Sequence, residues 1–115
     1  MSTMNQDKLG TVKVAANVLA TIVKLTAESV PGVARISEHR SGAGRLIGNR
    51  LGDGGGIKIE VREDSVHADL HIIVERDVNM LKVGKRVQRE VIDAVQKMVG
   101  LPVEEVNVYI QDVLD

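Results

Sequence analysis

The alternation of apolar and polar side chains in GIKIEVREDSVHADLHIIVE, residues 56–75, is the feature that most constrains the fold. A period of two is typical of β-strands that bury one face. The apolar residues of the two runs share a face only if Val61 lies opposite Val66, because a shift of one residue turns every side chain to the other face. The sequence therefore predicts an antiparallel hairpin that turns at residues 62–65.

The polar face of this hairpin then carries opposed side chains of compatible charge. Glu60 lies opposite His67, and Lys58 lies opposite Asp69. His67, Asp69 and His71 share the face and are metal-ligand types at a plausible spacing. Exposed cross-strand pairing explains the same residues, and Lys58 would place a positive charge beside a bound cation. We therefore expect neither a metal nor a cofactor at this face.

Two longer segments have the helical spacing of three and four residues. The first, Ala15–Ser29, ends before Pro31 and Gly32. Its predicted apolar stripe consists of Val18, Leu19, Ile22, Leu25 and Thr26. The second runs from Asn79, a favourable N-cap residue, to Gly100, a favourable terminating residue. Its predicted stripe consists of Val83, Val87, Val91, Ala94, Val95 and Met98.

Short alternating runs predict three further strands. These are VKV at residues 12–14, VARIS at residues 33–37 and VEEVNVYIQDV at residues 103–113. The resulting order is β-α-β-β-β-α-β, an α+β fold with a mixed β-sheet and two helices packed on one face. We expect a polar N-terminal tail over residues 1–11 and a single domain over residues 12–115. Residues 103–113 are the candidate sheet edge for self-association.

The glycine-rich segment SGAGRLIGNRLGDGGG, residues 41–56, holds seven of the eleven glycines in the chain. A phosphate-binding P-loop needs a Lys-Ser/Thr pair and a following helix, and this segment has neither. We interpret it as a mobile loop between two strands. The apolar residues within it are interleaved with Arg45 and Arg50, so a small docking element is an alternative interpretation. Those apolar residues are Leu46, Ile47 and Leu51.

Composition excludes several classes of protein. The chain has no Cys, which removes disulfides and thiolate chemistry. With no Phe, no Trp and one Tyr, it lacks the aromatic platforms on which single-stranded nucleic acids stack. No Ser-His-Asp order or paired-carboxylate motif indicates catalysis. The polar start and the lack of an apolar run of ~20 residues argue against a signal peptide or a membrane span. We expect a soluble protein that is not an enzyme.

A small KH-like RNA-binding module is the alternative function. Such a domain is also α+β, needs few aromatic residues and clamps the RNA backbone with a Gly-x-x-Gly loop. That loop joins two helices, whereas the glycines of residues 41–56 are predicted to join strands. The formal net charge of −1 also disfavours nucleic acid as a partner.

Four basic residues mark the first half of the second predicted helix. Their spacing of i, i+3, i+4 and i+7 places them on one side, where positive charge opposes the helix dipole. A merely solvated helix face explains such a cluster, and so does contact with an acidic partner segment or an anionic membrane surface. The candidate contact residues are Lys82, Lys85, Arg86 and Arg89, together with Arg45 and Arg50 of the glycine-rich segment.

Taken together, several stretches resemble the alkaline shock protein family, the bacterial cell-envelope stress response domain. They are VPGVARIS, GGGIKIEV, VHADLHIIVE and VGKRVQREVIDAVQKMVGLPVEEVNVYIQDV, in the family's order and spacing over Val12–Val113. The chain departs from the family at Ala15-Ala16, where a Ser or Asp usually caps the first helix. It departs again at Glu75-Arg76-Asp77, where an acidic-Tyr-Gly step is usual.

The resemblance implies a function that composition alone does not supply. It implies a non-enzymatic cytoplasmic protein, peripheral to the inner face of the cell membrane, that supports envelope homeostasis. It further implies recruitment by a small membrane-anchored partner protein and assembly into a homo-oligomer.

Overall fold

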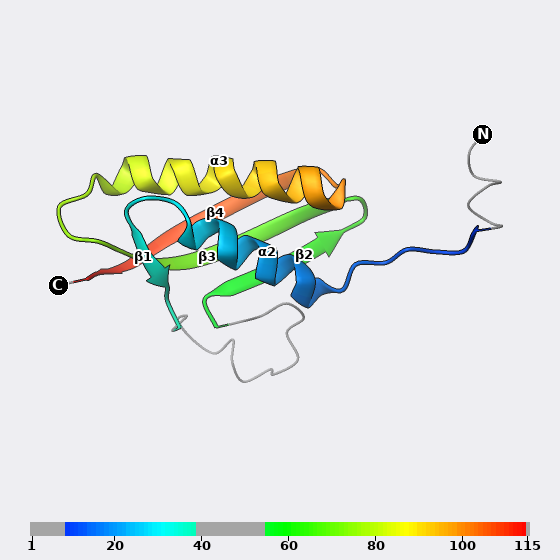
Figure 1. The fold of residues 1–115 in the computed structure, drawn as a ribbon, viewed down its shortest axis with the longest axis horizontal. Coiled ribbons are helices and arrows are strands. Elements are labelled where there is room, and N and C mark those ends of the chain that lie inside the picture. The colour runs from blue at the N-terminus through cyan, green and yellow to red at the C-terminus, as the bar shows by residue number, and fades with distance from the viewer. Residues whose placement is uncertain (1–8, 39–54, 115) are drawn as a thin grey trace.

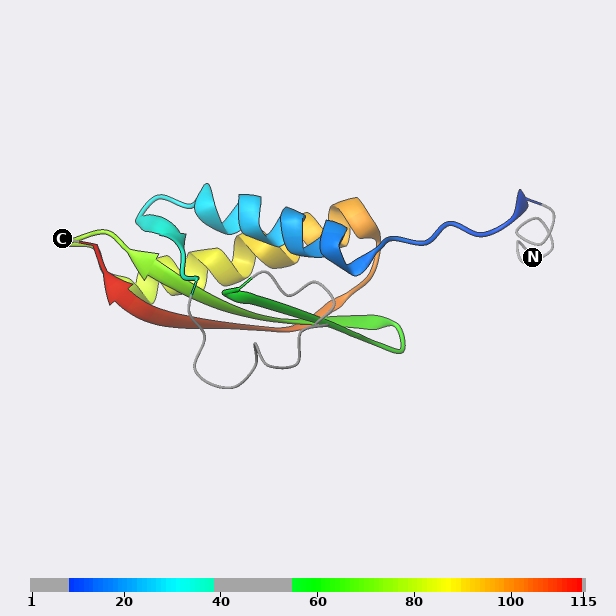
Figure 2. The same ribbon diagram turned by 90° about the horizontal axis from the view of Figure 1, so that it is seen from below.

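The computed structural model describes residues 9–38 and 55–114 as two helices packed on one face of a sheet. Figures 1 and 2 show the two layers, with both helices on the same side. The elements are α2 (Ala16–Glu28), β1 (Val33–Ile36), β2 (Ile57–Arg62), β3 (Ser65–Val74), α3 (Met80–Val99) and β4 (Val103–Val113). The predicted α+β class and the order from the first helix onward are confirmed.

The sheet is mixed and is organised around β3. Strand β2 pairs antiparallel with the first part of β3, and β1 pairs antiparallel with its last part. Strand β4 pairs in parallel with β3 from Val66 to Val74. Because β4 occupies one edge of β3 along this length, β1 and β2 lie end to end on the other edge. Among the described residues, strand β4 is therefore a margin of the sheet.

The predicted hairpin register is confirmed. Val61 lies opposite Val66, Glu60 opposite His67 and Lys58 opposite Asp69. This register turns the apolar row of β3 toward the helices, as the alternation required.

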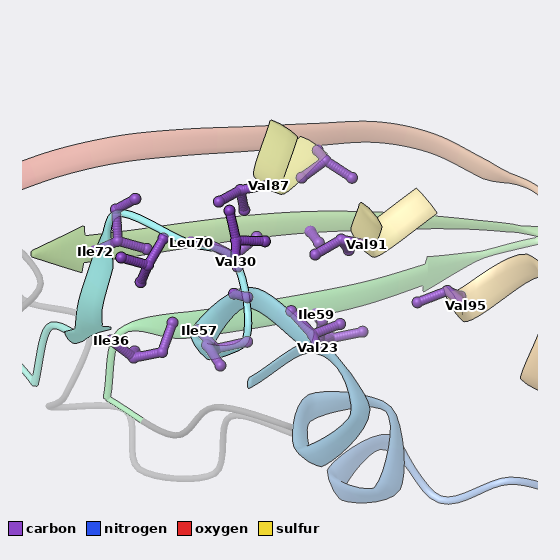
Figure 3. Close-up of a cluster of buried hydrophobic side chains, with 14 of the residues drawn as sticks. Val23, Val30, Ile36, Ile57, Ile59, Leu70, Ile72, Val87, Val91 and Val95 are labelled. Atoms are coloured by element: carbon purple, nitrogen blue, oxygen red, sulfur yellow. The ribbon is translucent and has the colours of Figure 1, made fainter. Parts of the chain in front are cut away.

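The core is built almost entirely from branched aliphatic side chains, as a chain poor in aromatic residues demands. Leu70 and Ile72 of β3 are fully buried, and Val23 of α2 is nearly so. Four valines of α3, at positions 83, 87, 91 and 95, pack onto the same cluster from above the sheet. Figure 3 shows α2, α3 and the strands contributing to this one cluster.

The apolar stripes of both helices differ in part from the prediction. In α2 the buried residues are Leu19, Val23 and Ala27, whereas Val18 and Leu25 are 47% and 63% exposed. Apolar residues occupy two overlapping rows of this helix, and periodicity alone does not choose between them. Met98 is 68% exposed because the buried row of α3 ends at Val95.

The strand predicted at residues 12–14 is wrong. Residues 10–15 have no regular secondary structure, and Val12 is 93% exposed. This segment extends away from the folded body (Figure 1). Three alternating residues carry too little apolar surface to hold a strand against a sheet. Helix α2 nevertheless begins at Ala16 although Ala15 supplies no side-chain cap.

Ser37, which precedes the glycine-rich segment, and Gly56, its last residue, meet on β3. The N–H of Ser37 donates to the carbonyl oxygen of His71 at 2.7 Å, and the N–H of His71 donates to the carbonyl oxygen of Gly56 at 2.8 Å. Strand β1 thus ends, and β2 begins, beside the same residue. Residues 39–54, including Arg45, Arg50 and the three apolar residues of the proposed docking element, lie outside the described part of the chain.

Candidate functional site

The first half of α3 presents the predicted basic cluster to solvent. The helix is fixed by its buried valines, by Asn79, whose side chain accepts from the N–H of Lys82 at 3.0 Å, and by Gly100 in the left-handed conformation at its end. This anchoring leaves the opposite side exposed. The exposed residues there include all four predicted basic residues of the helix, Lys82, Lys85, Arg86 and Arg89.

Little acidic charge balances this cluster. The first turn of α3 contains no acidic residue. Among the described residues, Arg86 alone of the four forms an ion pair, a long one of 3.9 Å to Glu90. In the second half of the helix the balance is different, because Lys97 lies 3.3 Å from Asp93. The excess positive charge is therefore confined to the N-terminal half.

Exposed apolar side chains adjoin the basic cluster. Leu81, in the first turn of α3, is 68% exposed and lies one turn before Lys85 on the same side of the helix, whereas Met80 lies in line with the buried valines. Leu114, 47% exposed, follows β4, whose C-terminal end lies at the end of the molecule where α3 begins (Figure 1). An exposed side with both apolar and basic residues is a feature of helices that lie at membrane interfaces. We call Leu81, Lys82, Lys85, Arg86 and Arg89 the α3 contact surface.

The polar face of the sheet forms a second cluster around His67, whose side chain is 14% exposed. Its Nε2 lies 2.9 Å from Glu104, and its Nδ1 lies 3.2 Å from Glu105. The sequence predicted Glu60 as the partner of His67, and Glu60 is indeed its backbone neighbour. The His67 ring instead pairs with the carboxylates of β4, while Glu60 forms an ion pair with Arg62 at 2.8 Å. Alternation along the sequence does not predict these contacts, because it does not give the register between β3 and β4.

Hydrogen bonds on this face hold two carboxyl groups in their charged form. The Asn107 side chain, donating at 3.2 Å, and then His67 lower the pKa of Glu105 below its ordinary value. The Arg62 guanidinium lowers the pKa of Glu60 in the same way. Asn107 also donates to Asp69 at 2.9 Å. These contacts tie β4 to the hairpin across the polar face.

His67, Asp69 and His71, the metal-ligand types of the polar face, each contact side chains of β4. His71 stacks on Tyr109 with ring centroids 4.8 Å apart, and its Nδ1 lies 3.3 Å from Gln111. A shallow depression of about 150 Å³ beside His67 is lined by both cationic and anionic side chains. Within residues 9–38 and 55–114, no group of three or more His, Cys, Asp or Glu side chains is placed to hold a metal ion.

Two further structural facts bear on the predicted functions. The glycine-rich segment connects β1 to β2, whereas a KH-type loop connects two helices. In the described part of the chain, neither helix combines the length and apolar character that crossing a membrane requires.

The fold and surfaces define a small α+β sandwich with a helical layer on one side and an open polar sheet face on the other. A sequence comparison assigns this sandwich to a family. The model of the alkaline shock protein family, described by its cell envelope-related function, matches residues 4–114. The chain therefore belongs to this family, which confirms the resemblance seen in its sequence.

Individual relatives cover nearly all of the chain. YqhY of Bacillus subtilis (strain 168) is 28% identical over 89% of this chain and 76% of the relative. YloU of the same organism is 24% identical over 98% of this chain and 96% of the relative. Spy1535 of Streptococcus pyogenes serotype M6 is 24% identical over 96% and 84%.

Solved structures of MamM CTD share the fold. A nickel form matches with a TM-score of 0.58 and 14% identity, covering 83% of this chain and 95% of that chain. A copper form matches with a TM-score of 0.57 and 16% identity, covering 83% and 82%. At this level of identity the likeness concerns the fold alone.

Proposed function

We propose that the protein is a non-enzymatic scaffold of the cell envelope that works in the cytoplasm at the inner face of the membrane. A small membrane-anchored partner protein recruits it, and several copies assemble there. Membership of a cell envelope-related family supports this role. The observation that carries the proposal is the α3 contact surface, in which exposed basic and apolar side chains adjoin.

The α3 contact surface has a charge distribution that helix stability does not favour. Lys82 lies in the first turn of α3, where a positive charge is mildly unfavourable, by about 0.3–1 kcal/mol at most. An anionic membrane surface would reverse this balance, because it attracts each nearby basic residue by about 1 kcal/mol. Exposed Leu81 would add apolar contact at the headgroup level. Arg45 and Arg50 are additional candidates for the same contact.

The attraction between one copy of the protein and the membrane is too weak to hold that copy there. Four basic residues contribute about 4 kcal/mol, which corresponds to a dissociation constant of about 1 mM. One copy alone would therefore leave the membrane readily. Assembly of several copies multiplies such weak contacts, and a membrane-anchored partner raises the local concentration of the protein.

Vesicle co-sedimentation tests the lipid contact. Vesicles containing an anionic phospholipid should bind the protein at low salt and release it at high salt, whereas neutral vesicles should not bind it. The variant Lys82→Glu/Lys85→Glu/Arg89→Glu should lose this binding. Arg86 is left unchanged because a glutamate there would repel Glu90, the partner of Arg86 in its ion pair.

A matched variant distinguishes the effect of the α3 contact surface from the effect of net charge. Lys13, Lys24 and Lys58 are exposed residues outside α3. Reversing all three to Glu changes the net charge by the same amount and should leave vesicle binding largely intact. Equal loss in both variants, or binding retained by the α3 variant, would refute the lipid contact. Capture of a membrane-fraction partner by the wild type but not by the α3 variant would instead assign the surface to the partner.

A further inference from the structure

The outer edge of β4 is open in the part of the chain that the structure describes. Strand β4 spans Val103–Val113, the longest strand of the sheet, and β3 is the one strand that pairs with it. Figure 3 shows β4 beside β3 at the margin of the sheet. A long edge strand offers a row of backbone groups to which another strand can bind.

The hydrogen bonds at the ends of β4 reveal which residues face outward. The Pro102 carbonyl oxygen accepts from the N–H of Val66, and the N–H of Leu114 donates to the carbonyl oxygen of Val74, so both ends face β3. Register shifts leave Glu104 and Gln111 without a partner residue on β3. Between Pro102 and Leu114, the backbone N–H and C=O groups of successive residues point alternately toward β3 and away from it. The outward-facing residues are Val103, Val106, Val108, Ile110 and Val113.

Side chains already satisfy both ends of this outward row. Gln96 of α3 accepts from the N–H of Val103 at 3.3 Å, and Gln88 of α3 donates to the carbonyl oxygen of Val106 at 2.9 Å. At the other end, the Asp112 carboxylate accepts from the N–H of Val113 at 2.8 Å. Val108 and Ile110, in the middle of the row, have no side-chain cap of this kind on their outward N–H and C=O groups in the described part of the chain.

We propose that a second copy of this chain pairs with β4 in antiparallel orientation, about a twofold axis at Tyr109. Val108 of each copy then lies opposite Ile110 of the other, and each such pair exchanges two backbone hydrogen bonds. The interface is self-complementary because Tyr109 is the midpoint of the two free residues. The inference specifies the geometry of the self-association that the proposed function includes.

Charge and capping select this register. Residues 107–111 are uncharged, and the nearest acidic residues, Glu105 and Asp112, flank them. A register centred on Val108 would instead pair Ile110 with Val106 of the second copy, whose carbonyl oxygen Gln88 already occupies. Pairing about Tyr109 preserves every cap.

Burial on both faces of β4 agrees with a second copy beside it. On the helix face, Val108 and Ile110 are only partly buried, whereas the neighbouring row of β3 is buried. On the polar face Tyr109, the one aromatic residue of the chain, is 45% exposed. Pairing would cover the apolar side chains and bring Tyr109 of the two copies together across the axis.

Single cysteines test the register, since the natural chain has none. Opposed residues of a non-hydrogen-bonded antiparallel pair have Cα atoms about 4.5 Å apart, within the range of a disulfide. Tyr109→Cys should therefore form a covalent dimer rapidly on mild oxidation. Asn107→Cys places its two sulfurs about four residues apart along the strands, or ~14 Å, and should crosslink slowly. Arg62→Cys, exposed on β2, measures random collision.

The relative rates decide the outcome. Faster crosslinking of Tyr109→Cys than of both other variants supports the interface. Faster crosslinking at Asn107 would overturn the register, and a rate at Tyr109 equal to that of Arg62→Cys would overturn the pairing altogether.

A proline variant tests whether the edge carries the association. The N–H of Val108 is not used by β3, so Val108→Pro removes an interface donor without removing a sheet hydrogen bond. We expect it to sediment as a monomer, while Val108→Ala remains associated. Tyr109→Lys, at an exposed position, provides a second disruption by opposing two like charges in case the proline variant does not fold.

These results separate the interface from the wider function. A wild type that stays monomeric at every concentration would overturn both self-association and this interface. A wild type that associates equally well with either disruptive variant would overturn the interface alone. Vesicle binding by the α3 contact surface is measured independently of both.

Discussion

A Cβ atom on Gly56 would overlap the carbonyl oxygen of Ser37. The close approach arises because both residues bond to the main chain of His71, where β1 gives way to β2. Gly56 is therefore required by space at the start of β2. Its role differs from the flexibility that the sequence alone suggested for residues 41–56.

Gly56→Ala should destabilise the protein. The added methyl group must displace backbone, which costs about 1–3 kcal/mol in overpacked sites. Thermal or urea unfolding measures the loss. Gly84→Ala is the matched control, because its Cβ would meet no atom within 4 Å and it lies inside α3. That control should be neutral or stabilising by up to about 1 kcal/mol, and equal destabilisation of both variants would contradict the spatial argument.

Shortening residues 43–53 to a few glycines should leave the fold intact. The backbone bonds to His71 hold Ser37 and Gly56, which lie on either side of this segment, close together. The entropy of closing a loop changes slowly with its length, by about 0.6 kcal/mol per doubling. Urea unfolding of the shortened protein measures the change. Loss of cooperative unfolding would show that Leu46, Ile47 and Leu51 belong to the core.

Glu105 should make stability depend on pH in the acid range. Asn107 and His67 lower its pKa in the folded protein, so the folded state binds fewer protons than the unfolded state. Its contribution is present above the ordinary pKa of a glutamate and is lost as the pH falls through the lowered value. Glu105→Gln should therefore lose less stability on acidification than the wild type. Glu75→Gln, an exposed control, should follow the wild-type profile.

The sequence predicted those features that periodicity determines. The hairpin register followed from one constraint, the shared face of Val61 and Val66, and it is confirmed. The limits of α3 followed from Asn79 and Gly100. The buried row of α2 did not follow, because two apolar rows compete on that helix and tertiary packing chooses between them.

The side-chain contacts between the parallel strands β3 and β4 could not be predicted from the sequence either. Its pattern identified residues 103–113 as an edge, but the register shifts at Glu104 and Gln111 are not visible in the alternation. They decide which backbone groups face outward and bring the carboxylates of β4 to His67. The four basic residues of α3 were predicted together, since helical spacing alone places them on one side, and their role stays a prediction.

Nickel or zinc should not stabilise the protein, although a structure with the same fold is a nickel form. His67 already lies beside Glu104 and Glu105, and His71 is stacked on Tyr109. A site filled at a hundred times its dissociation constant would add about 2.7 kcal/mol, a shift of many degrees for a small domain. We expect a melting temperature within about 1 °C of the metal-free value at a large excess of either ion. His67→Ala is the control. A rise of several degrees that disappears in this variant would establish a metal site on the polar face and refute our interpretation of its histidines.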